Sequence, residues 1–71
     1  MNYLKPVQVS PSGCKPADEQ AQDLLQALRG VELGDYDRRI VQWLAGWDAA
    51  VVETVVSLIY RARQAGPIPE G

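Results

Sequence analysis

The sequence contains no histidine and only one cysteine, Cys14, and these absences exclude several kinds of chemistry. Without histidine, the chain lacks the side chain that most often transfers protons near neutral pH. One cysteine cannot form an internal disulfide, and a structural zinc ion needs four ligands that come mainly from cysteine and histidine. The chain also lacks a phosphate-binding glycine loop and a nucleophile elbow. We therefore expect a protein that is not an enzyme and that uses no metal or other cofactor.

The charge balance and the apolar runs exclude further classes of protein. Seven basic and nine acidic residues give a net charge of −2, which argues against sequence-independent binding to nucleic acid. The longest apolar runs are too short to span a bilayer, and the first residues lack the continuous apolar segment of a signal peptide. A single unpaired cysteine suits a reducing compartment. We expect a cytoplasmic protein with no membrane contact and no evident small-molecule substrate.

The length of 71 residues indicates one small domain. A core of this size usually supplies only about 3–5 kcal/mol of net stability. Disulfides and metals, the usual reinforcements, are excluded by the composition, so tight helix packing or a partner chain has to serve instead. We expect a protein partner or self-association, with a homodimer favoured.

Three stretches of the chain carry apolar residues at helical spacing. We predict helices over residues 16–29, 35–46 and 48–65. Pro16 suits the first position of the first helix, where its missing N–H costs nothing, and Gly30 suits the end of that helix. Asp35 and Asp48 are candidate caps for the next two helices, because a carboxylate can accept hydrogen bonds from exposed backbone N–H groups. The predicted fold is a small all-α domain of three helices.

An arm and a tail flank the helices. Residues 1–15 contain two prolines, two serines and few helix-forming residues, and we predict an extended N-terminal arm. We interpret its first few residues as a loose leader. The alternative is an arm that lies across the domain or a neighbouring molecule. The three-helix domain then covers residues 16–66, and residues 67–71 form a tail.

The third predicted helix has an unusually wide apolar face. Its paired valines exclude a strand, because alternation would place half of them in water. They form two overlapping seams, and the first is spaced four, three and four residues apart, as in a coiled coil. That first seam is Val51, Val55, Leu58 and Ala62. The second seam is Val52, Val56 and Ile59. A helix with two seams can contact two neighbours, which are either the other two helices or one helix and an outside partner.

Trp43 and Trp47 form an aromatic pair one helical turn apart. We interpret them first as the centre of the core, because so short a chain has few other large side chains. Tryptophan is also enriched where proteins bind one another. The candidate protein-binding residues are Trp43, Trp47, Val51, Val55, Leu58 and Ala62.

Four arginines offer a second kind of surface. If the second and third helices run antiparallel, one end of the domain gathers Arg38, Arg39, Arg61 and Arg63. Such a cluster could bind nucleic acid, although neighbouring carboxylates weaken it and salt bridges explain it more simply. The favoured function is a non-enzymatic protein-binding module, either a homodimeric adaptor or a small inhibitor. The alternatives are a DNA-associated regulator and a small structural part of a virion.

The segment DRRIVQWLAGWDAAVVETVVSLIYRARQAG, residues 37–66, resembles small proteins of high-GC actinobacteria, their phages and mobile elements. The shared features are an arginine–isoleucine pair, a WLAGW-like turn and a closing R-A-R. The resemblance implies a small accessory protein, with an origin in a phage or mobile element. It implies no activity, so no residue receives a role from it.

Overall fold

In the computed structural model, which describes residues 3–69, three α-helices follow one another along the chain. Their bounds are Ala17–Ala27 for α1, Asp35–Ala45 for α2 and Ala49–Ala65 for α3. No strand occurs within the described residues, so the predicted all-α class is confirmed. Each helix begins and ends within two residues of its predicted bounds. The outermost two residues of the predicted arm and of the predicted tail lie outside the described part of the chain.

The helix starts differ from the predicted caps in their details. Pro16 has an extended backbone and lies just before α1 rather than inside it. Asp35 is the first residue of α2, so the prediction that it caps this helix is wrong. The carboxylate of Asp37 accepts a 2.9 Å hydrogen bond from the backbone N–H of Gly34 instead, because a side chain three residues into a helix reaches back to the residue that precedes it. Asp48 does precede α3, but its side chain makes no capping bond.

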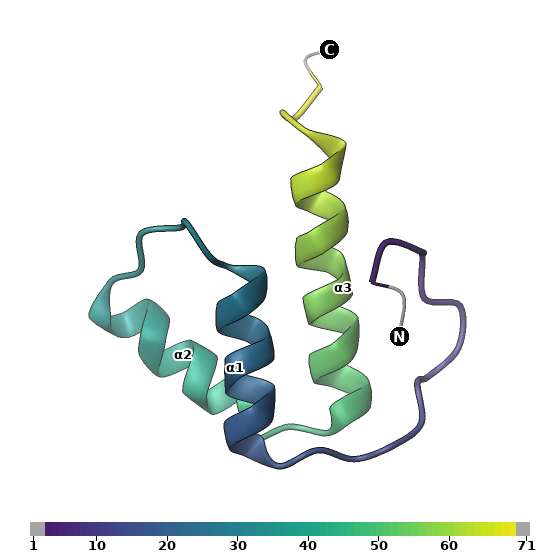
Figure 1. Ribbon diagram of the computed structural model, residues 1–71, viewed down its shortest axis with the longest axis vertical. Coiled ribbons are helices and arrows are strands. Elements are labelled where there is room, and N and C mark those ends of the chain that lie inside the picture. Colours follow the sequence, from purple (N-terminus) through teal and green to yellow (C-terminus); the bar gives the residue numbers. More distant parts are fainter. Residues whose placement is uncertain (1–2, 70–71) are drawn as a thin grey trace.

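The first helix, α1, packs against both α2 and α3 (Figure 1). α1 and α2 have 11 residues each and α3 has 17. At about 1.5 Å per residue, α3 is therefore roughly 9 Å longer than its neighbours. Figure 1 shows the C-terminal turns of α3 extending past α1. None of these helices has the length and apolar character that crossing a membrane requires.

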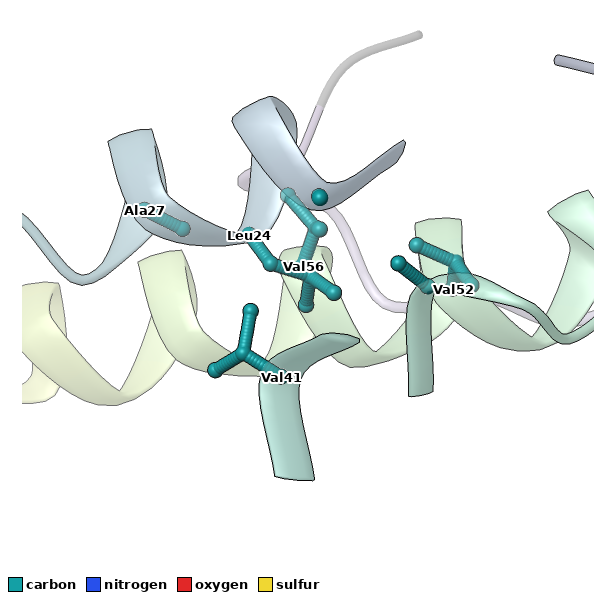
Figure 2. Packing of buried hydrophobic residues seen from close by; sticks show 7 residues of the cluster. Leu24, Ala27, Val41, Val52 and Val56 are labelled. Atoms are coloured by element: carbon teal, nitrogen blue, oxygen red, sulfur yellow. The ribbon is translucent and has the colours of Figure 1, made fainter. Parts of the chain in front are cut away.

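The apolar core is small, and none of its buried members among the described residues is aromatic. It consists of Ala21, Leu24, Ala27, Val41, Ala45, Val52 and Val56. Figure 2 shows Val41 pointing from α2 toward Leu24 of α1 and Val56 of α3. Three alanines, three valines and one leucine bury little side-chain area, since the hydrophobic contribution scales with the apolar surface removed from water.

The N-terminal arm lies along α3 on the side away from α1 (Figure 1). The hydroxyl of Ser57 donates a 2.9 Å hydrogen bond to the backbone carbonyl oxygen of Tyr3. The Tyr3 ring stacks on the ring of Tyr60, with centroids 5.3 Å apart and planes 18° apart. These contacts agree with the predicted alternative of an arm across the domain, and they show that Tyr3 does not belong to a loose leader.

Candidate protein-binding surfaces

The two predicted seams of α3 lie in different environments. Val52 and Val56 are fully buried in the core, and Ile59 packs against it. The other seam remains partly in water, with Val51 39% exposed and Leu58 52% exposed. We call this partly exposed seam the α3 stripe. It consists of Val51, Val55, Leu58 and Ala62. The apolar arc of α3 is wider than the area that α1 and α2 cover, so the stripe is left over.

A groove lies between the arm and the first turns of α3. It has a volume of about 480 Å³ and opens widely to solvent. Its lining comes from the arm residues Val7, Gln8, Val9, Ser10 and Pro11 and from the α3 residues Ala50, Val51, Thr54 and Val55. None of these nine residues is charged, and Val51 and Val55 belong to both the groove and the α3 stripe. The groove therefore favours apolar groups and extends the stripe sideways.

The beginning of the arm is anchored to α3 through the contact between Tyr3 and Ser57. A helical wheel places Ser57 on the polar side of α3. Ser57 is nevertheless fully buried, because the arm covers it. Its hydroxyl also accepts a 3.2 Å hydrogen bond from Nε of Arg61. Burial, and secondarily the negative charge of Asp23, raise the pKa of the Tyr3 phenol. The Tyr3 ring therefore packs against the domain with its phenol group protonated.

The second helix and the turn that follows it expose an aromatic face, which we call the α2 face; Trp47 lies in that turn, two residues past the end of α2. Its members, with their exposed fractions, are Tyr36 (70%), Ile40 (41%), Trp43 (60%) and Trp47 (49%). The interpretation of the two tryptophans as the centre of the core is therefore wrong. α2 turns the opposite side, with Val41 and Ala45, toward α1. The small side chains of Val41 and Ala45 allow α1 and α2 to pack closely. The large side chains of the α2 face are left in water.

The two indole rings are held in a defined arrangement. Their centroids are 5.5 Å apart and their planes meet at 73°, which is the edge-to-face geometry that aromatic pairs prefer. The backbone beneath them is fixed by Gln20 of α1, whose side chain is buried. Its Nε2 donates hydrogen bonds of 2.8 Å to the carbonyl oxygen of Ala45 and 2.9 Å to that of Trp47. No sequence signal distinguishes Gln20 from the exposed glutamines, so sequence reasoning missed it.

The four predicted arginines are not gathered at one end of the domain. Arg61 contacts Ser57, and Nη1 of Arg63 donates a 3.3 Å hydrogen bond to the carbonyl oxygen of Ala27 at the end of α1. Figure 1 shows the first turn of α2, which carries Arg38 and Arg39, well away from the last turns of α3. Within residues 3–69, no hydrogen bond or ion pair involves the side chains of Arg38 and Arg39.

A different arginine, Arg29, joins the C-terminal ends of α1 and α3. Its guanidinium lies 5.9 Å from the centroid of the Tyr60 ring, and its Nη1 donates a 2.9 Å hydrogen bond to the carbonyl oxygen of Gln26. Arg29 and Arg63 thus both satisfy carbonyl groups at the end of α1, where cationic side chains are favourable. This arrangement explains their positions without a nucleic-acid ligand.

Searches of protein-family models, of curated proteins and of solved structures found no match to this chain.

Proposed function

We propose that the protein is a non-enzymatic protein-binding module that uses the α3 stripe and the adjoining groove to hold an apolar segment of a partner protein. The observation that supports this most directly is the exposure of Leu58 and Val51 next to a groove without charged residues. An adaptor or a small inhibitor needs a surface of this kind and no catalytic group.

The spacing of the α3 stripe favours a helical partner. Its residues follow one another at intervals of four, three and four along a continuous helix. That interval is the one at which two helices insert side chains between each other's turns. An amphipathic helix recognised in an apolar groove presents its own anchors at the same intervals. We therefore expect the partner to contribute an amphipathic helix that lies along α3 beside the arm.

Site-directed photo-crosslinking tests the proposal. A photoreactive amino acid is placed at Leu58 in one variant and, as a matched control, at Gln64 in another. Both positions are exposed on α3, but Gln64 is outside the stripe. After irradiation in cells that produce the protein, we expect a discrete crosslinked product at position 58 and none at 64, with the attachment point mapped by mass spectrometry to an apolar helical segment.

A charge-introducing variant provides the second arm of that experiment. With the photoreactive amino acid moved to Val51, Leu58→Glu should abolish capture of the partner, because it puts a charge into the centre of an apolar contact. The helical circular dichroism spectrum should stay unchanged, since Leu58 is half exposed in the isolated domain. If Leu58→Glu captures the same protein as efficiently as the parent, the α3 stripe is not the binding surface.

A further inference from the structure

We infer that the α2 face is a self-association surface, through which two copies of this chain pair with their α2 helices antiparallel. This face is separate from the α3 stripe and the groove, and its role does not depend on the function proposed for them.

The first reason is where the chain places its large side chains. The sequence has five aromatic residues, two tryptophans and three tyrosines, and three of these five lie on the α2 face. Within residues 3–69, the core has seven buried apolar residues, three of them alanine. A core of this size usually supplies only about 3–5 kcal/mol of net stability, and association is one way to add to it. A second copy of the chain is always present at the same concentration as the first, so it is always available as a partner.

The second reason is the spacing of the face. Tyr36, Ile40, Trp43 and Trp47 are separated by four, three and four residues, which reads the same in both directions. A two-fold axis brings one surface against an identical one, so residue i meets j and j meets i. In an antiparallel pair, Tyr36 of one copy then meets Trp47 of the other, and Ile40 meets Trp43. Each tryptophan is thus opposite a side chain smaller than another tryptophan.

The third reason is area. An aromatic side chain buries about 150–250 Å², and the three rings are 49–70% exposed. They therefore offer roughly 270–450 Å² per copy. A specific interface buries about 600–1,000 Å² per partner, so the rings alone supply about half to three quarters of the smaller requirement. Ile40 and the flanking polar side chains supply the rest. The dimer should therefore be weak for a specific complex, with a dissociation constant in the micromolar range.

Rigidity and charge also favour the pairing. The Trp43–Trp47 pair is already in its edge-to-face arrangement, and Gln20 fixes the backbone beneath it, so association orders little. The charged residues of α2 are two aspartates and two arginines, whose formal charges cancel. Two copies of this helix can therefore approach without net repulsion.

Sedimentation equilibrium and tryptophan fluorescence, measured on the full chain over a dilution series, test the inference. We expect a dimeric mass at high concentration that falls to the monomeric mass on dilution. The emission maximum should shift to longer wavelength over the same range, because both tryptophans return to water. A monomeric mass and an unchanged emission maximum at every concentration would overturn the inference.

Two variants and a matched control locate the surface. Tyr36→Glu and Trp43→Glu place a charge at positions that are exposed in the single chain, so we expect helical circular dichroism as in the parent and a monomeric mass throughout. Ile68→Glu makes a comparable change at an exposed residue of the tail, which is 90% exposed, and should leave the dimer intact. Leu58→Glu, which tests the proposed function, should also remain dimeric, so failure of one idea is distinguishable from failure of the other. A dimer that survives both α2 changes would contradict the assignment.

Disulfide trapping tests the antiparallel direction. In a Cys14→Ser background, one copy carries Ile40→Cys and the other carries Trp43→Cys. We expect the mixed disulfide to form faster than either symmetric one, because the antiparallel pair places position 40 opposite position 43. Predominance of the two symmetric disulfides would show a parallel pair and overturn this part of the inference.

Discussion

The side-chain amide of Gln20 donates a 2.8 Å hydrogen bond to the backbone carbonyl oxygen of Ala45, the last residue of α2. The same amide nitrogen donates to the carbonyl oxygen of Trp47. The last carbonyl groups of a helix have no partner within it, and burying them unpaired is costly. Gln20 therefore joins α1 to the junction of α2 and α3, and it fixes the position from which the Trp43–Trp47 pair projects.

Replacing Gln20 by leucine should lower the free energy of unfolding by about 1–3 kcal/mol, because the buried carbonyl group of Ala45 and the partly buried one of Trp47 lose their donor. Urea denaturation followed by circular dichroism measures the change. Gln22→Leu is the control, since Gln22 is an exposed residue of the same helix, and we expect an effect within about 0.5 kcal/mol. Equal losses in the two variants would show that the Gln20 bonds contribute nothing specific.

The helices could be predicted from sequence because local signals agree with one another. Apolar spacing defined the helical stretches, and Gly30 and Gly66 follow the ends of α1 and α3 with backbone φ angles of +86° and +82°. The two seams of α3 could be separated on a helical wheel before their environments were known. Which seam is buried could not, because that depends on where α1 crosses α3 rather than on α3 itself.

The environment of the α2 face was predicted wrongly for a physical reason. A helical wheel shows that Tyr36, Ile40 and Trp43 share one side, but it does not show whether that side meets the core. Because large apolar residues are usually buried, the sequence favoured the prediction that this side meets the core. The core instead takes the opposite side of α2, where Val41 and Ala45 let two helices approach closely. Gln20 has no local signal at all, since its role depends on carbonyl groups 25 and 27 residues away.

Ser57→Ala should release the arm from α3. The change removes the donor to the Tyr3 carbonyl oxygen and the acceptor for Arg61, and we expect a loss of about 0.5–1.5 kcal/mol in unfolding free energy. In NMR spectra, the Tyr3 ring resonances should move toward those of a free tyrosine, because the stack with Tyr60 is lost. Ser12→Ala, in the exposed part of the arm, should change neither quantity. Unmoved Tyr3 resonances in Ser57→Ala would show that the ring stack alone holds the arm.

Stability should fall at alkaline pH through two groups in and beside the arm. Burial raises the pKa of Tyr3 above its ordinary 10.0, and the 2.7 Å hydrogen bond to Asp23 raises the pKa of Lys15 above its ordinary 10.5. In both cases the folded chain holds the proton more tightly than the unfolded chain does. Their contribution is therefore complete below the unfolded pKa values and is lost as pH rises through the folded ones.

Urea denaturation at about pH 8 and about pH 11 measures this loss. Tyr3→Phe should show a smaller loss than the parent between the two pH values, because it keeps the ring and removes the ionising group. Tyr36→Phe is the control and should lose as much as the parent, since Tyr3 and Lys15 are still present. A loss in Tyr3→Phe as large as that of the parent would exclude Tyr3 as a contributor.

Two glycines should respond in opposite ways to alanine. Gly30 has a φ of +86°, where a side chain is strained, so Gly30→Ala should cost about 1–2 kcal/mol. Gly46 follows α2 with a φ of −81°, which any residue adopts, and an added Cβ would meet only the Trp43 carbonyl oxygen at 3.4 Å. Gly46→Ala should therefore be neutral or stabilise by up to about 1 kcal/mol through the unfolded chain. Thermal and urea unfolding of the two variants give the comparison, and a similar loss in both would contradict it.

The two seams of α3 should separate stability from binding. Val56 is fully buried among α1 and α2 residues, so Val56→Ala should lower the unfolding free energy by about 1.5–3 kcal/mol through lost burial and a residual cavity. Leu58 is half exposed, and Leu58→Ala removes more atoms but should cost less than about 1 kcal/mol, because most of them contact water already. Photo-crosslinking from a second stripe position, Val51, should then weaken in Leu58→Ala while the Val56→Ala protein that remains folded still captures the partner. A larger stability loss for Leu58→Ala than for Val56→Ala would mean that the stripe belongs to the core and is not free for a partner.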